Sequence, residues 1–149
     1  MAGPKNILLV EDDRHDQFFF IKALKNIENV VIQDIAEDGI AAIAKLESLP
    51  VLPDLIFMDI NMPRMNGLEC LEEISKHATY SQIPVVMLST STEELELTRS
   101  LGAKGFIKKS GNTDLLQQNL QGILDSAFAD NNSTANNNFE PGSAGDIIG

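Results

Sequence analysis

Four kinds of side chain suited to chemistry each stand at the end of a short apolar run. They are an acid pair, a single aspartate, a hydroxyl and an ammonium: Glu11 with Asp12, Asp59, Ser89 and Lys109. A carboxylate can act as a nucleophile or bind a hard cation, while an ammonium and a hydroxyl stabilise an oxyanion. Like charges about 4 Å apart repel by roughly 4 kcal/mol at an effective dielectric of about 20, so clustered carboxylates need a compensating cation. Oxygen ligands favour Mg²⁺. These residue types therefore predict a site for a phosphoryl group on a carboxylate.

Each of these residues also has an ordinary explanation when it is taken alone. An aspartate at a strand end is usually a turn former or a helix cap, and a run of acids is usually a solvated turn. A single lysine or serine is usually a surface or capping residue. The combination favours a functional site, because all four kinds follow apolar runs in the chain order acid pair, aspartate, serine and lysine.

The elements that must position these side chains form an alternating pattern. Five runs read as strands: residues 7–10, 30–32, 55–58, 85–88 and 105–107. The first, third and fourth are continuously apolar, which is typical of central parallel strands covered on both faces. Apolar residues at helical spacing follow each run. A βα unit repeated five times predicts a parallel sheet with helices on both faces. Sites in such sheets form beyond the carboxyl ends of the strands, where the four kinds of side chain would meet.

Composition limits the classes of function. The chain has 149 residues, of which 43% are hydrophobic, which suits one ordinary domain. Its net charge of −11 disfavours binding to DNA or to anionic membranes. No apolar run is long enough to span a bilayer, and a single cysteine excludes an internal disulfide, so we expect a soluble cytoplasmic protein. Residues 129–149 are rich in Asn and Gly and are predicted to be a disordered polar tail.

Four stretches of the sequence together resemble a response-regulator receiver domain. They are ILLVEDD, LIFMDINMPRMNG, VVMLSTS and GAKGFIKK, and the resemblance covers roughly residues 4–128. It implies a single flavodoxin-like (βα)₅ domain, in which a five-stranded parallel sheet is doubly wound. A match in four separate motifs is far more specific than a match in any one of them.

The resemblance also implies a role for individual residues. Asp59 corresponds to the phosphoacceptor. The positions that would bind Mg²⁺ are Glu11, Asp12, Asp59 and the backbone carbonyl of Asn61. Those that would contact the phosphoryl group or switch with it are Ser89, Lys109 and the aromatic Phe106. Gly67 corresponds to the turn glycine that opens the third helix; a plain left-handed or tight-turn glycine is the local explanation, and the two explanations are compatible.

Three positions depart from the pattern of the family. Ser110 stands where proline usually follows the lysine, which leaves open whether the Lys109–Ser110 peptide is cis. Phe106 lacks the hydroxyl of the more common tyrosine. Thr90 is larger than the usual alanine or glycine beside the conserved hydroxyl, so it narrows access to the phosphoryl group.

The implied function is a signalling switch controlled by phosphorylation. A histidine kinase or a histidine phosphotransfer protein would donate a phosphoryl group to Asp59, and the face made by the fourth helix, fifth strand and fifth helix would change its affinity for a downstream effector protein. Such a domain catalyses only its own phosphorylation and dephosphorylation, and it is not a multiple-turnover enzyme.

Some alternatives stay open at this point. Leu115 and Phe128 either support a homodimer through the fourth helix, fifth strand and fifth helix, or they are ordinary surface residues. The chain could also be a receiver-like scaffold that is never phosphorylated. A phosphatase of the haloacid dehalogenase type is the main enzyme alternative, but it uses a second aspartate where this chain has Asn61.

Overall fold

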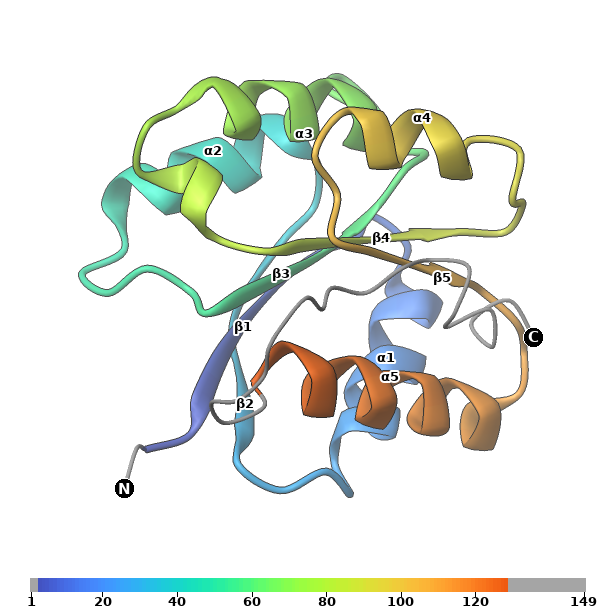
Figure 1. Cartoon of the computed structure of the whole chain (residues 1–149). Coiled ribbons are helices and arrows are strands. Elements are labelled where there is room, and N and C mark those ends of the chain that lie inside the picture. The colour runs from blue at the N-terminus through green and yellow to red at the C-terminus, as the bar shows by residue number, and fades with distance from the viewer. Residues whose placement is uncertain (1–2, 129–149) are drawn as a thin grey trace.

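One parallel sheet of five strands forms the centre of the protein, as the computed structural model in Figure 1 shows. The structure describes residues 3–128. The strand order is β2-β1-β3-β4-β5. The strands are β1 (Lys5–Val10), β2 (Val30–Ala36), β3 (Leu55–Asp59), β4 (Val85–Ser89) and β5 (Gly105–Lys108). The helices are α1 (Arg14–Leu24), α2 (Gly39–Ser48), α3 (Gly67–Lys76), α4 (Leu95–Ser100) and α5 (Thr113–Ala127), with a 3₁₀ turn at Tyr80–Gln82.

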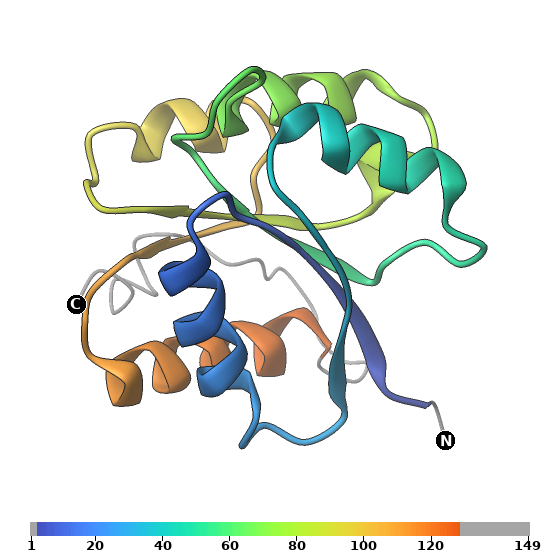
Figure 2. The ribbon, with the colours of Figure 1, turned by 180° about the vertical axis from the view of Figure 1, so that it is seen from behind.

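Helices cover both faces of the sheet, as Figures 1 and 2 show from opposite sides. Two apolar clusters result, and neighbouring residues of β1 divide between them. Ile7 and Leu9 pack toward α1 and α5, while Leu8 and Val10 pack toward α2 and α3. All five residues of β3 are buried, as expected of a strand with helices on both sides. The flavodoxin-like doubly wound fold is therefore confirmed.

The starts of α1, α2, α3 and α5 have a local cause in the sequence, whereas α4 begins without a side-chain cap. Asp13, Asp38, Asn66 and Asn112 cap α1, α2, α3 and α5, each by accepting a hydrogen bond from a backbone N–H of the first turn. Asn66 and Glu69 form a complete capping box. These caps fix where the four helices begin after their strands, and so they help to fix the loops that precede them at the carboxyl edge of the sheet.

The second strand is longer than the sequence predicts. The strand runs to Ala36, whereas the sequence predicts an end at residue 32. The strand lies at the edge of the sheet, and its second half includes the polar residues Gln33 and Asp34. Its true end brings Asp38 to the same edge of the sheet as the predicted site. A strand exposed at an edge does not need a continuous apolar run, so the pattern ends too early.

Other expectations can be compared with residues 3–128. No peptide bond among them is cis, so the Lys109–Ser110 bond is trans. Leu115 and Phe128 are half-buried, and Phe128 packs against the cluster between α1 and α5, while the homodimer stays a prediction. No helix in this range is both long and apolar enough to cross a membrane. The predicted disordered tail, residues 129–149, lies outside the described residues.

Candidate functional site

The acid pair lies directly beyond the end of β1. Glu11 is 1% exposed, and its Oε2 accepts a hydrogen bond of 3.1 Å from the Asp13 N–H. Its own carbonyl accepts from Gln17 Nε2 at 2.7 Å, which ties the loop to α1. Asp12 is exposed, and Asp13 is the N-cap of α1. The sheet therefore buries one acid of the pair and leaves the other open to solvent.

Asp59 is the last residue of β3 and is 5% exposed. The loop after Asp59 brings Gly67 back next to Ile60, and the Gly67 N–H donates a hydrogen bond to Ile60 O at 2.8 Å. Gly67 starts α3 and is not among the glycines with positive φ, so it is not left-handed, and of the two local explanations only the tight turn remains. A Cβ at Gly67 would overlap the Asp59 carbonyl oxygen and lie 2.8 Å from the Ile60 Cα. This glycine is needed for close approach.

Ser89 and Phe106 come from the two neighbouring strands. Ser89 ends β4 and is 1% exposed, and its Oγ accepts a hydrogen bond of 3.2 Å from the Ser91 N–H. Phe106 in β5 is completely buried and belongs to the cluster on the α3 face of the sheet. The Ser89 carbonyl accepts from the Lys109 N–H at 2.6 Å, so the backbone of the hydroxyl residue is joined to that of the lysine.

Lys109, just beyond β5, brings the site together with three ion pairs. Its Nζ lies 2.9 Å from Glu11 Oε1, 3.0 Å from Asp59 Oδ1 and 2.8 Å from Asp16 Oδ2. An ammonium group has three N–H donors, so it can donate one hydrogen bond to each of the three carboxylates. Asp16, in the first turn of α1, is a site residue that reading the strand ends alone misses. Its only sequence signal is its place one turn after the acid pair.

The site holds more negative charge than one lysine can compensate. Burial raises the pKa of Glu11 to about 7, although Lys109 opposes the shift and the charge of Asp59 adds to it. Burial also raises the pKa of Asp59; Lys109 again opposes the shift, while the charges of Asp12 and Asp16 add to it. Burial disfavours the charged form of Lys109, but the hydrogen bonds to Asp16 and Glu11 outweigh it and raise the pKa of the ammonium.

The residues present fit a divalent cation. Glu11, Asp12 and Asp59 each offer a carboxylate oxygen, and these oxygens lie within 4.8 Å of one another. Mg²⁺ binds oxygen ligands at about 2.1 Å, so two ligands on opposite sides of the ion are about 4.2 Å apart, which small side-chain rotations would reach. Oxygen ligands alone and an unbalanced negative charge both favour a hard cation.

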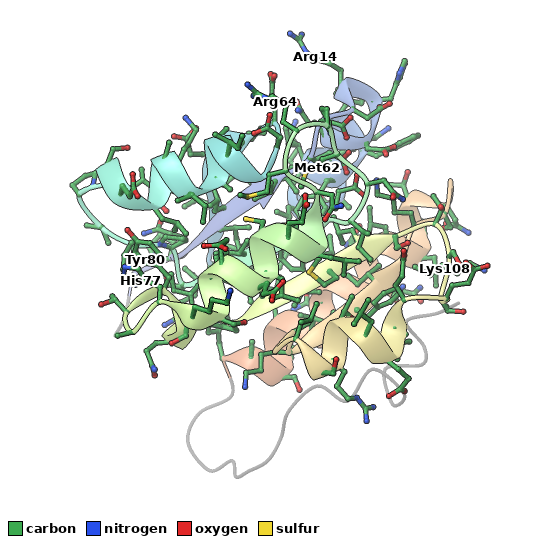
Figure 3. All side chains as sticks on the ribbon, turned by 90° about the horizontal axis from the view of Figure 1, so that it is seen from above. Arg14, Met62, Arg64, His77, Tyr80 and Lys108 are labelled. Atoms are coloured by element: carbon green, nitrogen blue, oxygen red, sulfur yellow. The ribbon has the colours of Figure 1, made fainter. Side chains whose placement is uncertain are left out.

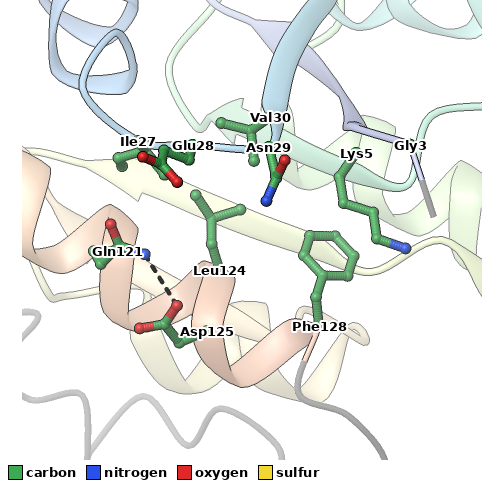
Figure 4. A pocket seen from close by; sticks show the side chains of 10 residues that line it. All are labelled: Gly3, Lys5, Ile27, Glu28, Asn29, Val30, Gln121, Leu124, Asp125 and Phe128. Atoms are coloured by element: carbon green, nitrogen blue, oxygen red, sulfur yellow. Dashed lines mark hydrogen bonds between the residues drawn. The ribbon is translucent and has the colours of Figure 1, made fainter. Parts of the chain in front are cut away.

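The hollows of the surface do not by themselves identify this site. A hollow of about 440 Å³ lies at the opposite end of β1, between the loop before β2 and the end of α5 (Figure 4). Lys5 Nζ lies there 5.0 Å from the centre of the Phe128 ring. A smaller cavity of about 40 Å³ lies beside Lys109 and Asp16. Size favours the first hollow, but the clustered carboxylates and the ammonium are at the strand ends, so we place the functional site there.

The predicted site residues are distributed as follows. The structure brings together Glu11, Asp12, Asp59 and Lys109, with Ser89 joined to Lys109 through its backbone. Asn61 is exposed in the loop after β3, two residues beyond Asp59, and Phe106 lies in the core behind the strand ends. The roles of these residues stay predictions.

The sequence matches a known family along most of its length. The response regulator receiver domain matches residues 7–121. Response regulator Rcp1 from Synechocystis is 38% identical over 130 residues, which cover 80% of this chain and 86% of that protein. A protein-glutamate methylesterase from Vibrio cholerae is 39% identical over 111 residues, which cover 72% of this chain but only 29% of the methylesterase. The chain therefore belongs to the response regulator receiver family.

Solved structures agree with this assignment. The phosphorylated cyanobacterial phytochrome response regulator RcpA has a TM-score of 0.75 and 34% identity, covering 91% of this chain and 99% of that one. The Mn²⁺-bound form of Rcp1 has a TM-score of 0.70 and 33% identity, covering 89% and 99%. Receivers of this family act in two-component signalling and bind a divalent metal at an acidic pocket, as the acid cluster here would. Membership implies a phosphodonor and an effector as partners in general.

Proposed function

We propose that this receiver is a switch whose phosphoacceptor is Asp59. The single observation that carries the proposal is the contact of the Lys109 ammonium, 3.0 Å from Asp59 Oδ1, inside a cluster of buried acids. An aspartate that serves only as a turn former or helix cap needs no buried ammonium beside it. Asp13 is such a cap, because it lies on the surface and accepts its hydrogen bond from the first turn of α1.

The transfer requires little more than an ionised carboxylate and charge stabilisation. An oxygen of Asp59 forms a bond to phosphorus while the bond from phosphorus to the histidine nitrogen of the donor breaks, and that nitrogen keeps the electron pair. Lys109 would stabilise the charge on the transferred oxygens, and it favours the ionised form of Asp59 against the effect of burial. Mg²⁺ held by Glu11, Asp12, Asp59 and the Asn61 carbonyl would supply further charge compensation at those oxygens.

The conformational response would run through Ser89 and Phe106. The Ser89 hydroxyl accepts from the Ser91 N–H, and its own hydrogen is available to a phosphoryl oxygen. Phe106 is already buried, so phosphorylation would stabilise this rotamer instead of creating it, which is a shift of population. The surface made by α4, β5 and α5 would then change its affinity for an effector protein.

The donor is proposed to be a histidine kinase or a histidine phosphotransfer protein. We further propose that residues 4–128 act as one receiver unit and that the chain catalyses only its own phosphorylation and dephosphorylation. The homodimer through α4, β5 and α5 and the cytoplasmic location stay predictions from the sequence.

Intact-mass spectrometry after incubation with acetyl phosphate and Mg²⁺ tests the phosphoacceptor. The wild type should gain the mass of one phosphoryl group, and Asp59→Asn should gain none. Asp114→Asn, which changes an exposed acid of α5, is the matched control and should be phosphorylated like the wild type. If the wild type gains no mass, the protein is a scaffold, and if Asp59→Asn gains as much as the wild type, the acceptor is another residue. Release of phosphate from simple monoesters would instead favour the phosphatase.

A further inference from the structure

The loop between Asp59 and α3 is fastened to a neighbouring element that the proposed mechanism does not use. Residues 60–66 form this loop, and they include Asn61, whose carbonyl is the expected backbone ligand of the cation. The Gly39 N–H at the start of α2 donates to Met65 O at 2.9 Å. The Gly39 Cα is so close that a Cβ there would lie 2.8 Å from Met65 Sδ. The start of α2 is therefore packed directly against the loop.

A buried carboxylate strengthens this attachment. Asp38 is 1% exposed and uses its two oxygens for two different elements. Oδ1 accepts from Ala41 N at 2.8 Å and so caps α2. Oδ2 accepts from Arg64 Nε at 2.6 Å and also from Arg64 Nη2. Helix capping needs only the first of these contacts, so the second must be explained by the loop.

The backbone of Arg64 indicates that the pair determines the shape of the loop. Its φ is +63°, in the left-handed region that glycine, and to a lesser extent asparagine, tolerates best. An arginine adopts this conformation only where its surroundings stabilise it. Figure 3 shows Arg64 and Met62 together on the loop before α3, at the end of the molecule where Arg14 begins α1 and away from His77 and Tyr80. The ion pair is thus at the same end of the sheet as the acid cluster.

We propose that Asp38 and Arg64 are positioning residues for the divalent cation, because they hold the loop that carries the Asn61 carbonyl. This inference rests on the proposed function insofar as that function needs the cation. Neither side chain contacts the acid cluster directly. They act as outer residues that orient a ligand, a role in which substitutions commonly cost about 10-fold to 100-fold in metal affinity.

If Arg64 acts only through its charge, its removal should strengthen Mg²⁺ binding, and if it acts by positioning the loop, its removal should weaken Mg²⁺ binding. A substitution at Arg64 therefore distinguishes the two roles. Removing a positive charge near a cation site strengthens cation binding if the charge acts only through the electrostatic field. Removing a clamp that places a ligand weakens binding. Arg64→Gln should therefore tighten Mg²⁺ binding in the first case and weaken it in the second. At Asp38, loss of the charge and loss of the positioning contact would both weaken Mg²⁺ binding, so a substitution of Asp38 alone does not separate the two roles.

The experiment is a titration of the unphosphorylated full chain with Mg²⁺, followed by amide chemical shifts in two-dimensional NMR. We expect the Mg²⁺ dissociation constant to rise about tenfold in Arg64→Gln. The rise should be smaller in Arg64→Lys, because an ammonium keeps the ion pair but loses the planar fork of the guanidinium. Asp38→Asn keeps a side-chain oxygen that can cap α2 while it removes the charge, so it should fold and also bind Mg²⁺ more weakly.

The matched control is the ion pair of Lys45 with Asp34, at 3.2 Å, which joins α2 to β2 away from the loop. Lys45→Gln should change the dissociation constant by less than about twofold, because the pair is partly exposed and does not contact the loop. The proposal is overturned if Arg64→Gln binds Mg²⁺ as tightly as the wild type or more tightly, or if the wild type binds none. Weakened binding in Arg64→Gln supports the proposal even if acetyl phosphate leaves Asp59 unmodified, and that result would overturn the proposed function alone.

Discussion

Replacing Gly67 with alanine is a direct test of how closely the backbone packs behind Asp59, the proposed phosphoacceptor. The added Cβ would overlap the Asp59 carbonyl oxygen and lie 2.8 Å from the Ile60 Cα, and both neighbours are backbone atoms that no side-chain rotation can move. Overpacking of this kind costs up to about 3 kcal/mol. Alanine in place of glycine stabilises a helix by about 1 kcal/mol. We therefore expect Gly67→Ala to lower the free energy of unfolding by about 2 kcal/mol.

Urea unfolding followed by far-UV circular dichroism measures this loss. Gly122→Ala is the matched control, because Gly122 lies within α5 and a Cβ there would meet nothing within 4 Å. This control should be stabilised by up to about 1 kcal/mol. Gly67→Ala should also be phosphorylated more slowly by acetyl phosphate, because relief of the overlap must move Asp59 or the start of α3. A variant as stable as the wild type and phosphorylated at the same rate would refute the reasoning.

Three further substitutions or reagents test the electrostatics and burial described above. Burial disfavours the ionised form of Asp38, but the Ala41 N–H and the Arg64 guanidinium outweigh burial, so the pKa of Asp38 is lowered. Asp38→Asn should therefore reduce the free energy of unfolding at pH 7. The difference in this free energy between wild type and variant should shrink as the pH falls through the folded-state pKa of Asp38. Urea unfolding at pH 7 and at low pH measures that difference. Asp16→Asn should lower the pKa of Asp59 in a carboxyl ¹³C NMR titration, and it should change stability by less than about 1 kcal/mol, because the Asp16 side chain is 40% exposed. Burial raises the pKa of the Cys70 thiol to about 12, so a disulfide reagent at pH 8 should label Cys70 in urea but not in the folded protein.

Much of the fold follows from the sequence, because the sheet is parallel and mostly buried. β3 and β4 have helices on both faces, so each must be apolar along its length, and a continuous run such as Leu55–Met58 marks each with an error of about one residue. The residues that follow the parallel strands must then lie at one edge of the sheet. This geometry brings together Asp59, at the end of β3, and Lys109, just after β5, and it requires no knowledge of the loops.

The remaining site residues escape this reasoning for two physical reasons. Asp16 approaches Lys109 from the first turn of α1, and the direction of a helix after its cap depends on packing that sequence spacing does not reveal. Asp38 lies beyond the true end of β2, which polar edge positions hide. Had β2 been extended to Ala36, the rule of reading the strand ends would have found Asp38. Its partner Arg64 would still have been missed, since a left-handed arginine in a loop has no sequence signature.

The charge of the site also explains part of the acidity of the whole chain. Glu11, Asp16 and Asp59 contact the Lys109 ammonium, and Asp12 lies beside Glu11 and Asp59, so four carboxylates and one ammonium give a charge of −3 when all are ionised. Glu11 and Asp59 are buried, and burying these two charges opposes folding unless they are paired. Lys109 reduces the cost, and a divalent cation would remove most of what remains. The proposed phosphorylation of Asp59 would add negative charge at the same place, so we expect Lys109 to shift toward the phosphoryl oxygens. Asp16 is the carboxylate best able to lose that contact, because its exposed side chain can exchange the ammonium for water, whereas Glu11 cannot.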